Sequence, residues 1–286
     1  MGKVYDALRK AEDQRARRLA EAAGAAAEPG FAPPAHGGHA VDGEHVFERL
    51  RAKVAPPVST EGGDVHNKRR IVLLQPESVV AEQFRSLRAR IDALAESRPL
   101  RTIAVTSALP GEGKTMAAIG LAAVSAMQLG SKVALVECDL REPTIAASLG
   151  LRIDAGLAEV LDGVPLEQAM TRAPGSPLDV LAVRGLPQNP SELLSSERMD
   201  RLLETLATRY ERVILDLPPT LGLPDAKTVS GSCDGTVFVV RADQTPQPDI
   251  EAALEVLGRD RVIGVVMNDA DAELDRYRYG KYAPRS

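Results

Sequence analysis

A glycine-rich loop that ends in lysine and threonine carries the clearest chemical pattern in the sequence. Residues 108–115 read Ala-Leu-Pro-Gly-Glu-Gly-Lys-Thr and lie between a β-rich run, Thr102–Thr106, and a helical run, Met116–Leu129. Backbone N–H groups of such a loop wrap phosphates at a helix start, while the lysine reaches the β- and γ-phosphates and the threonine hydroxyl binds Mg²⁺. The pattern predicts an ATP–Mg²⁺ site with contacts from Ala108, Pro110, Gly111, Glu112, Gly113, Lys114, Thr115 and Met116.

Two acidic strand ends supply the carboxylates that a phosphate loop needs beside it. Residues 134–141 (ALVECDLR) place Glu137 and Asp139 two apart, on the same side if the chain stays extended. Residues 213–219 (VILDLPP) end a strand at Asp216, and their prolines stop further pairing. Taken alone, each acidic strand end also fits a turn or a helix cap. Next to a matched phosphate loop, we expect Asp139 and Asp216 to join Thr115 around the metal, directly or through water.

Apolar, β-rich runs alternate with helical patterns from residue 69 onward, and these elements must position the motifs. The alternation predicts an α/β domain with a doubly wound, mostly parallel sheet. The runs are Thr102–Thr106, Val133–Val136, Val180–Val183, Val213–Leu215, Thr236–Val240 and Val262–Met267.

The chain divides into four parts by composition. Residues 1–21 form a short, highly charged helical pattern, and Ala, Gly and Pro supply almost half of residues 22–68. Such a segment buries too little apolar surface to offset its ordering entropy, so we expect a disordered linker. The α/β pattern occupies 69–270. A tail, 271–286, holds three of the five tyrosines, namely Tyr277, Tyr279 and Tyr282.

Composition excludes several classes of protein. A net charge of −5 over 286 residues leaves no basic footprint for nucleic acid over the chain as a whole. All four histidines precede residue 69, so the α/β domain must work without imidazole. The uncharged stretch Thr115–Gly130 is too short and too polar to span a bilayer. The two cysteines, and the lack of a secretory leader pattern, favour a reduced, cytoplasmic protein.

Several of these motifs together resemble the bacterial tyrosine kinases of capsule and exopolysaccharide systems. The resemblance rests on SALPGEGKT (107–115), VECDLREP (136–143) and VILDLPP (213–219) followed by LPDA, and it covers about residues 70–286. It implies a phosphate-loop NTPase fold of the deviant Walker type. It also implies ATP- and Mg²⁺-dependent autophosphorylation of the tail tyrosines between subunits, with Lys114, Glu137, Asp139 and Asp216 as catalytic residues.

A helix motif adds to the resemblance. Residues 76–91 contain Glu82-x-x-Arg85-x-x-Arg88, and spacing alone predicts only a local ion pair on a solvated helix. The family resemblance implies instead that these three residues join subunits into a ring. The helix should bury an apolar stripe made of Val80, Phe84, Leu87, Ile91 and Leu94.

The sequence departs from the family at Glu137, where aspartate is usual. The resemblance assigns this position to activating the acceptor hydroxyl, so the longer side chain should affect transfer more than ATP binding. The chain otherwise resembles the stand-alone cytoplasmic type. That type implies a separate membrane activator of the polysaccharide co-polymerase kind, a phosphotyrosine phosphatase, and peripheral placement at the inner membrane face.

Two other functions stay open at this point. A partition or division ATPase shares the fold, but such proteins carry an extra lysine where this chain has Leu109. A pseudokinase scaffold would bind ATP and gate a membrane co-polymerase without transferring phosphate, and Glu137 is the feature in its favour.

Overall fold

A computed structural model describes residues 69–128 and 130–270. All of these described residues belong to one unit. The predicted N-terminal helix (1–21), the linker (22–68) and the tyrosine tail (271–286) lie outside the described residues. None of the described helices has the length and apolarity needed to cross a bilayer.

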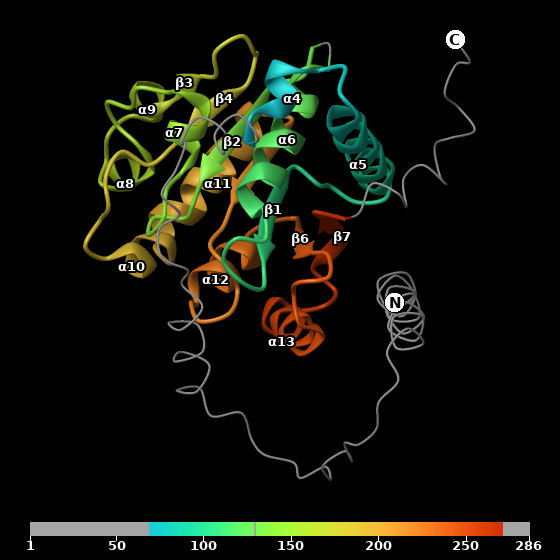
Figure 1. Ribbon diagram of the computed structural model, residues 1–286. Coiled ribbons are helices and arrows are strands. Elements are labelled where there is room, and N and C mark those ends of the chain that lie inside the picture. The colour runs from blue at the N-terminus through green and yellow to red at the C-terminus, as the bar shows by residue number, and fades with distance from the viewer. Residues whose placement is uncertain (1–68, 129, 271–286) are drawn as a thin grey trace, which may run out of the picture. The chain divides into compact units, whose positions relative to one another are not determined.

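A seven-stranded sheet forms the centre of the described domain (Figure 1), in the order β3-β4-β2-β5-β1-β6-β7. Every neighbouring pair is parallel except β3 with β4. This confirms the predicted doubly wound, mostly parallel sheet. The strands are β1 (Thr102–Ser107), β2 (Val133–Glu137), β3 (Thr171–Arg172), β4 (Asp179–Leu181), β5 (Arg212–Asp216), β6 (Gly235–Arg241) and β7 (Val262–Asn268).

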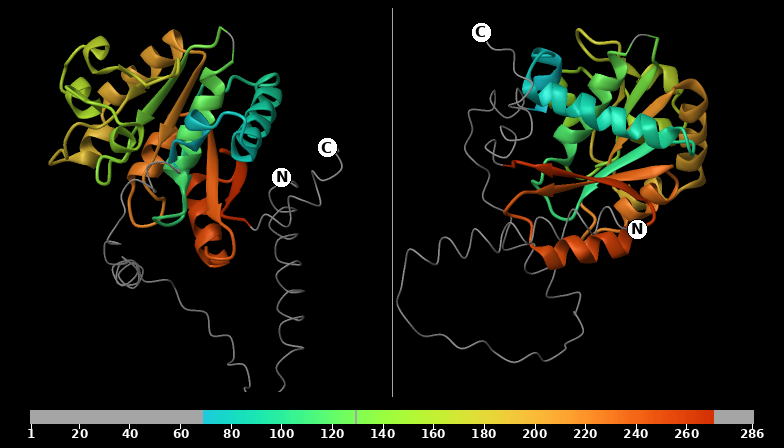
Figure 2. Two further views of the ribbon diagram at one scale, coloured as in Figure 1. Left: turned by 45° about the horizontal axis from the view of Figure 1, so that its top comes forward. Right: turned by 90° about the vertical axis from the view of Figure 1, so that its right-hand side faces the viewer.

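Helices cover both faces of the sheet, as Figure 2 shows. One apolar core joins alternate strand residues to α4, α5, α6 and α7, and a second core on the other face joins α8 to α12. The helices are α4 (Ile71–Leu74), α5 (Val79–Ala95), α6 (Lys114–Ala126), α7 (Ile145–Leu149), α8 (Leu157–Leu161), α9 (Leu166–Ala169), α10 (Pro190–Leu194), α11 (Glu197–Arg209), α12 (Asp225–Gly231) and α13 (Gln247–Leu257).

Local chemistry explains where two of the longer helices begin. Ser78 and Ser196 are the N-caps of α5 and α11, and each hydroxyl accepts a backbone N–H three residues later. The central strands β1 and β2 are buried along their whole length, which is why they read as unbroken apolar runs.

The order of the strands positions the site. β1 lies between β5 and β6, and β5 also pairs with β2, so the carboxyl ends of β2, β5 and β1 are neighbours. Glu137 at the end of β2 is in register with Asp216 at the end of β5. The loops that leave these strands therefore meet at one edge of the sheet, where doubly wound folds bind their ligands.

The structure corrects some predicted boundaries. α6 begins at Lys114, two residues before the predicted start, and β3 was not predicted at all. β4 ends at Leu181 because the Val183 N–H donates to a side chain instead of the sheet. In α5, Leu94 is exposed and does not belong to the predicted apolar stripe, and Ala81 is buried in its place.

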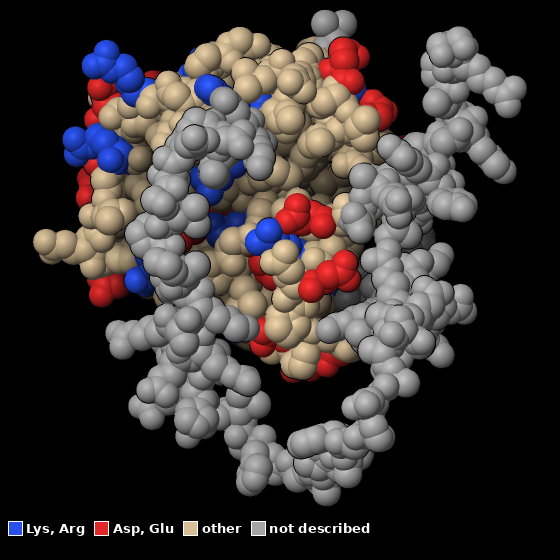
Figure 3. Space-filling view, viewed as in Figure 1, with Lys and Arg blue, Asp and Glu red and all other residues tan. Residues whose placement is uncertain are grey.

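Acidic and basic side chains are interspersed on the described surface that Figure 3 presents. Many of them pair directly, as Arg241 does with Asp269 at 2.7 Å. This pattern follows from a sequence with 40 acidic and 35 basic residues.

Candidate active site

The phosphate loop connects β1 to α6 and has the conformation that anion binding requires. Gly111 and Gly113 adopt positive φ angles of 81° and 95°, which side chains rarely tolerate. α6 begins without any side-chain cap at Gly113, so its first N–H groups have no capping side chain. Ala108 keeps a negative φ, since Asp243 and Asp269 are the only described non-glycine residues with a positive one. Uncapped N–H groups at the start of a 13-residue helix attract phosphate.

Lys114 forms a buried ion pair with Asp139. Its Nζ lies 2.7 Å from Oδ2 of Asp139, and the two side chains are 12% and 5% exposed. Burial alone would lower the pKa of Lys114, but the carboxylates of Asp216 and Asp139 outweigh it and raise that pKa. The lysine is therefore a fixed positive charge at the helix start.

Asp216 is a buried carboxylate that accepts no hydrogen bond from the described residues. It is 1% exposed, and both carboxylate oxygens lack a donor. Burial raises its pKa, against the opposing effects of the Lys114 charge and of the neighbouring Thr115 hydroxyl. Buried polar atoms of this kind need a partner. Thr115, also buried, and Asp139 complete a set of hard oxygen donors, so these residues fit Mg²⁺, which takes few protein ligands beside phosphate and water.

The described residues contain no cluster of three or more metal-binding side chains of the histidine, cysteine or carboxylate types.

Glu137 has different surroundings from Asp139, although one residue separates them. Its side chain is fully buried, and its carboxylate accepts backbone N–H groups from Thr144, Ile145 and Val183 at 2.5–3.0 Å. Burial raises the pKa of Glu137 to about 6, while these hydrogen bonds oppose the rise. The role of Glu137 in accepting the hydroxyl proton stays a prediction. In this structure its carboxylate connects the end of β2 to the start of α7 and to the segment after β4.

Shortening Glu137 to aspartate should destabilise the fold. The shorter side chain cannot reach all three N–H groups, and each buried donor left unpaired costs about 1–3 kcal/mol. We expect the unfolding free energy of Glu137→Asp, measured with urea, to fall by about that amount. Glu142→Asp makes the same change at an exposed neighbour and should have no effect. Equal stability of the two variants would contradict this assignment.

The other predicted loop contacts fall in two environments. Pro110 and Gly111 are exposed, and Met116 is half-buried. Glu112 is 3% exposed, and its carboxylate accepts the N–H of Leu109 at 2.9 Å. The side chain of Glu112 therefore stabilises the conformation of the loop, and its backbone N–H is the group that can contact a phosphate.

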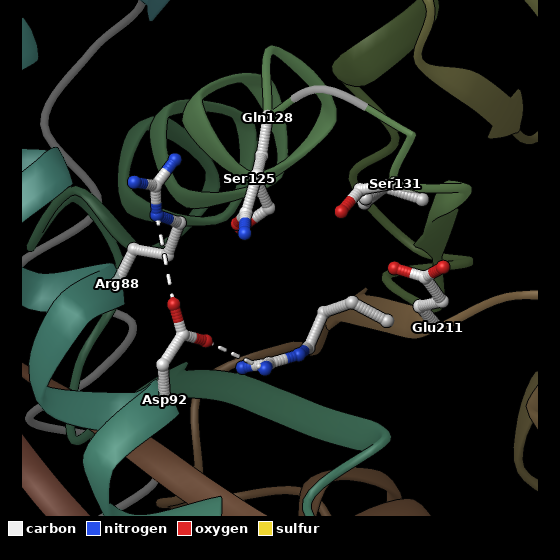
Figure 4. A pocket seen from close by; sticks show the side chains of 8 residues that line it. Arg88, Asp92, Ser125, Gln128, Ser131 and Glu211 are labelled. Carbon is white, nitrogen blue, oxygen red and sulfur yellow. Dashed lines mark hydrogen bonds and ion pairs between the residues drawn. The ribbon is translucent and has the colours of Figure 1, made fainter.

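The three residues of the predicted motif on α5, Glu82, Arg85 and Arg88, have two different kinds of partner. Arg85 pairs with Glu82 at 2.9 Å on the surface of α5. Arg88 donates instead to the carbonyl of Val124 at 2.8 Å, near the end of α6, and lies 3.7 Å from Asp92. Arg88, Asp92 and Arg212 are among the residues that line a pocket of about 140 Å³. Figure 4 shows Arg88 and Asp92 at this pocket. Arg88 thus joins α5 to α6 within the domain.

The tail tyrosines Tyr277, Tyr279 and Tyr282 lie outside the described residues. Two residues that contact the phosphate loop, Thr245 and Asn268, were not predicted. They lie 133 and 156 residues from Glu112, and no local spacing in the sequence signals them.

No model of a known protein family matches the sequence, but individual proteins do. Tyrosine-protein kinase YwqD of Bacillus subtilis is 36% identical over 219 residues, which cover 75% of this chain and 91% of YwqD. Succinoglycan biosynthesis transport protein ExoP of Rhizobium meliloti is 32% identical over 231 residues, covering 74% of this chain. This chain spans only 29% of the length of ExoP.

Solved structures agree with these relatives. The kinase domain of the Escherichia coli tyrosine kinase ETK superposes with a TM-score of 0.66 at 26% identity, covering 78% of this chain and 84% of that domain. The nucleotide-binding fold is thus that of a phosphate-loop NTPase. The likeness to YwqD extends over nearly the whole relative, and the chain therefore belongs to the bacterial tyrosine-protein kinase family.

Proposed function

We propose that this kinase uses ATP and Mg²⁺ to phosphorylate Tyr277, Tyr279 and Tyr282 between subunits, and thereby regulates capsule or exopolysaccharide synthesis or export. Residues 69–270 would form the kinase domain. Residues 271–286 would be its substrate tail, with a short helix (1–21) and a linker (22–68) before the domain. The kinase names of the relatives and the name of ExoP support this reading.

One observation carries the proposal: Lys114 and two carboxylates meet at the uncapped start of α6. Lys114 is paired with Asp139 in this structure, while Asp216 has no donor. The three side chains carry a net charge of −1, which suits a divalent cation together with nucleotide phosphates. A partition ATPase would also have this lysine and these carboxylates, but it would carry a further lysine at the position where this chain has Leu109.

Each residue would have a distinct task. Gly111, Gly113 and the start of α6 would bind phosphate oxygens through N–H groups, and Lys114 would turn from Asp139 toward the phosphates. Thr115, Asp139 and Asp216 would hold Mg²⁺, directly or through water. When bound, Mg²⁺ would supply positive charge that neutralises the charge developing during transfer.

The acceptor tyrosine must lose a proton, because its hydroxyl has a pKa near 10 when unperturbed. A carboxylate within reach is the usual acceptor. Glu137 is buried with both oxygens occupied, whereas Oδ2 of Asp139 becomes free once Lys114 turns to the phosphates. Oδ1 of Asp139 accepts the N–H of Glu142 at 3.1 Å, so Oδ2 is the oxygen that can take the proton. We therefore favour Asp139 as the proton acceptor, which requires that its contact to Mg²⁺ runs through water.

Partners follow from the same family. Glu82, Arg85 and Arg88 would contribute to a ring of subunits, with Arg88 acting through its hold on α6. A membrane activator of the co-polymerase type would dock the kinase at the inner membrane face, and a phosphatase would reverse the modification. The matched region is less than a third of ExoP, which is named a transport protein. This supports a kinase that works together with a polysaccharide transport protein.

Transfer between subunits can be tested by mixing two incomplete chains. One chain carries Lys114→Met and keeps its tail, and the other is active but lacks residues 276–286. We expect phosphotyrosine on the first chain, detected by mass spectrometry of its C-terminal peptide. Each chain alone should stay unmodified, and no phosphate in the mixture would exclude transfer in trans.

The same mixture tests whether the tail is a switch. The tail holds four basic and three acidic side chains, and each phosphotyrosine adds a charge of about −1.5 to −2. A tail with three phosphates should be repelled from the carboxylates at the phosphate loop. Light scattering should then show smaller assemblies, and assemblies of unchanged size would exclude the switch alone.

A further inference from the structure

Two residues that are far from the phosphate loop in sequence make hydrogen bonds to it. Thr245 lies in the connection between β6 and α13, and Asn268 is the last residue of β7. Each makes a hydrogen bond to Glu112, Thr245 to the side chain and Asn268 to the backbone. The carboxyl ends of β6 and β7 therefore both reach the loop that follows β1.

The side chain of Glu112 makes hydrogen bonds that stabilise the loop from inside. One carboxylate oxygen accepts the N–H of Leu109 at 2.9 Å, and the other accepts the hydroxyl of Thr245. The side chain is nearly fully buried, and burial raises its pKa while these hydrogen bonds oppose the rise. The carboxylate thus links three points of the chain, namely the start of the loop, its centre and the β6–α13 connection.

The hydroxyl of Thr245 contacts both the backbone and Glu112. It accepts the N–H of Arg241 at 3.0 Å, and its single proton has two acceptors within reach, the carbonyl of Arg241 at 3.2 Å and the carboxylate of Glu112. The charged carboxylate is the stronger acceptor. Arg241 in turn pairs with Asp269 at 2.7 Å, joining the ends of β6 and β7. Glu112 is therefore connected, through Thr245 and Arg241, to the paired ends of β6 and β7.

Asn268 fixes the peptide that precedes Lys114. Its Nδ2 donates to the carbonyl of Glu112 at 2.9 Å, and its side chain lies against Gly113, where a Cβ would come within 2.1 Å of Nδ2. Because a peptide unit is planar, holding the carbonyl of Glu112 also fixes the direction of the Gly113 N–H. Gly113 N–H belongs to the group that binds phosphate in such loops.

We propose that Thr245 and Asn268 are positioning residues of this kinase, which keep the phosphate loop in its binding shape before nucleotide arrives. The inference rests on nucleotide binding at this loop, as proposed above. Preformed sites bind more tightly because the ordering cost is met in advance. Loss of either contact should therefore weaken nucleotide binding more than it changes the rate of transfer by the filled enzyme.

The test compares Thr245→Val, which keeps the shape but removes the hydroxyl, with Thr245→Ser, which restores it. The probe is a fluorescent ADP analogue with Mg²⁺, added to the full chain. We expect a dissociation constant about tenfold higher for Thr245→Val and for Asn268→Ala, with KM for ATP rising and kcat changing less than threefold. Thr245→Ser should bind within twofold of the unmodified chain.

Controls separate positioning from folding and from the proposed function. Thr205→Val removes a hydroxyl of α11 that donates to the carbonyl of Arg201, and should leave nucleotide binding unchanged. All variants should melt within a few degrees of the parent. Glu112→Ala should weaken binding by itself, and adding Thr245→Val to it should have no further effect.

Each result decides one question. If the unmodified chain fails to bind the Mg²⁺–ADP analogue, the proposed nucleotide site is wrong. If it binds, and Thr245→Val and Asn268→Ala bind equally well, the positioning role alone is wrong. Additive losses for Glu112→Ala and Thr245→Val, or failure of Thr245→Ser to restore binding, would also overturn it.

Discussion

Replacing Lys114 by methionine is expected to abolish phosphotyrosine formation, with a loss of about 10³-fold or more. The lysine is the positive charge at the start of α6, where phosphate would bind, and preorganised charges of this kind stabilise the charge that develops during transfer. Mass spectrometry of the C-terminal peptide, after incubation of the purified chain with Mg-ATP, measures the loss. Undiminished phosphorylation would exclude the kinase site described above.

The same substitution should also reduce stability, because Lys114 is half of a buried ion pair. Removing one partner leaves Asp139 and Asp216 as buried, uncompensated charges, at a cost of about 3 kcal/mol. The pKa of Asp216, already raised by burial, then loses the opposing lysine charge and rises further. Since the folded state then binds more protons than the unfolded one, the defect should shrink as the pH falls toward 5.

A double variant separates the two effects of Lys114. Lys114→Met with Asp139→Asn removes both charges of the pair, so most of the lost stability should return while activity stays absent. Urea unfolding at pH 7 measures this. A double variant that is less stable than Lys114→Met alone would contradict the ion-pair explanation.

The sequence predicted the residues of the site better than their contacts. Lys114 and Asp139 follow β1 and β2, and Asp216 is the last residue of β5. Parallel strands bring their carboxyl ends to one edge, so a local pattern was enough to predict that these residues lie together. The pairing of Lys114 with Asp139 depends on side-chain positions at that edge. The sequence pattern contains no information on it.

Glu137 and Leu94 show where sequence patterns mislead. Residues two apart share a side only while the strand continues, and β2 ends at Glu137, so Asp139 and Glu137 have separate partners. Leu94 has helical spacing, but it lies in the last turn of α5 and is 41% exposed, while its neighbour Ala95 packs against the core. Thr245 and Asn268 could not be predicted, because their contacts with Glu112 exist only in the folded chain.

Replacing Asp216 by asparagine is expected to change activity and stability in opposite directions. Asp216 is fully buried without a donor, and beside the Lys114–Asp139 pair it leaves the cluster with a net charge of −1. Asparagine removes that charge, so the unfolding free energy at pH 7 should rise by about 1–2 kcal/mol. Phosphotyrosine formation should fall about 10²- to 10³-fold, because a ligand for Mg²⁺ is lost.

The pH dependence and a control make this second test specific. The pKa of Asp216 is raised in the folded state, so protonation stabilises the parent chain as the pH falls, and the advantage of Asp216→Asn should disappear toward pH 4. Asp234 accepts the N–H groups of Arg101 and Thr102, so Asp234→Asn should lower stability and leave phosphorylation intact. Loss of stability in Asp216→Asn would mean that its carboxylate has a structural partner, and full activity would remove it from the metal site.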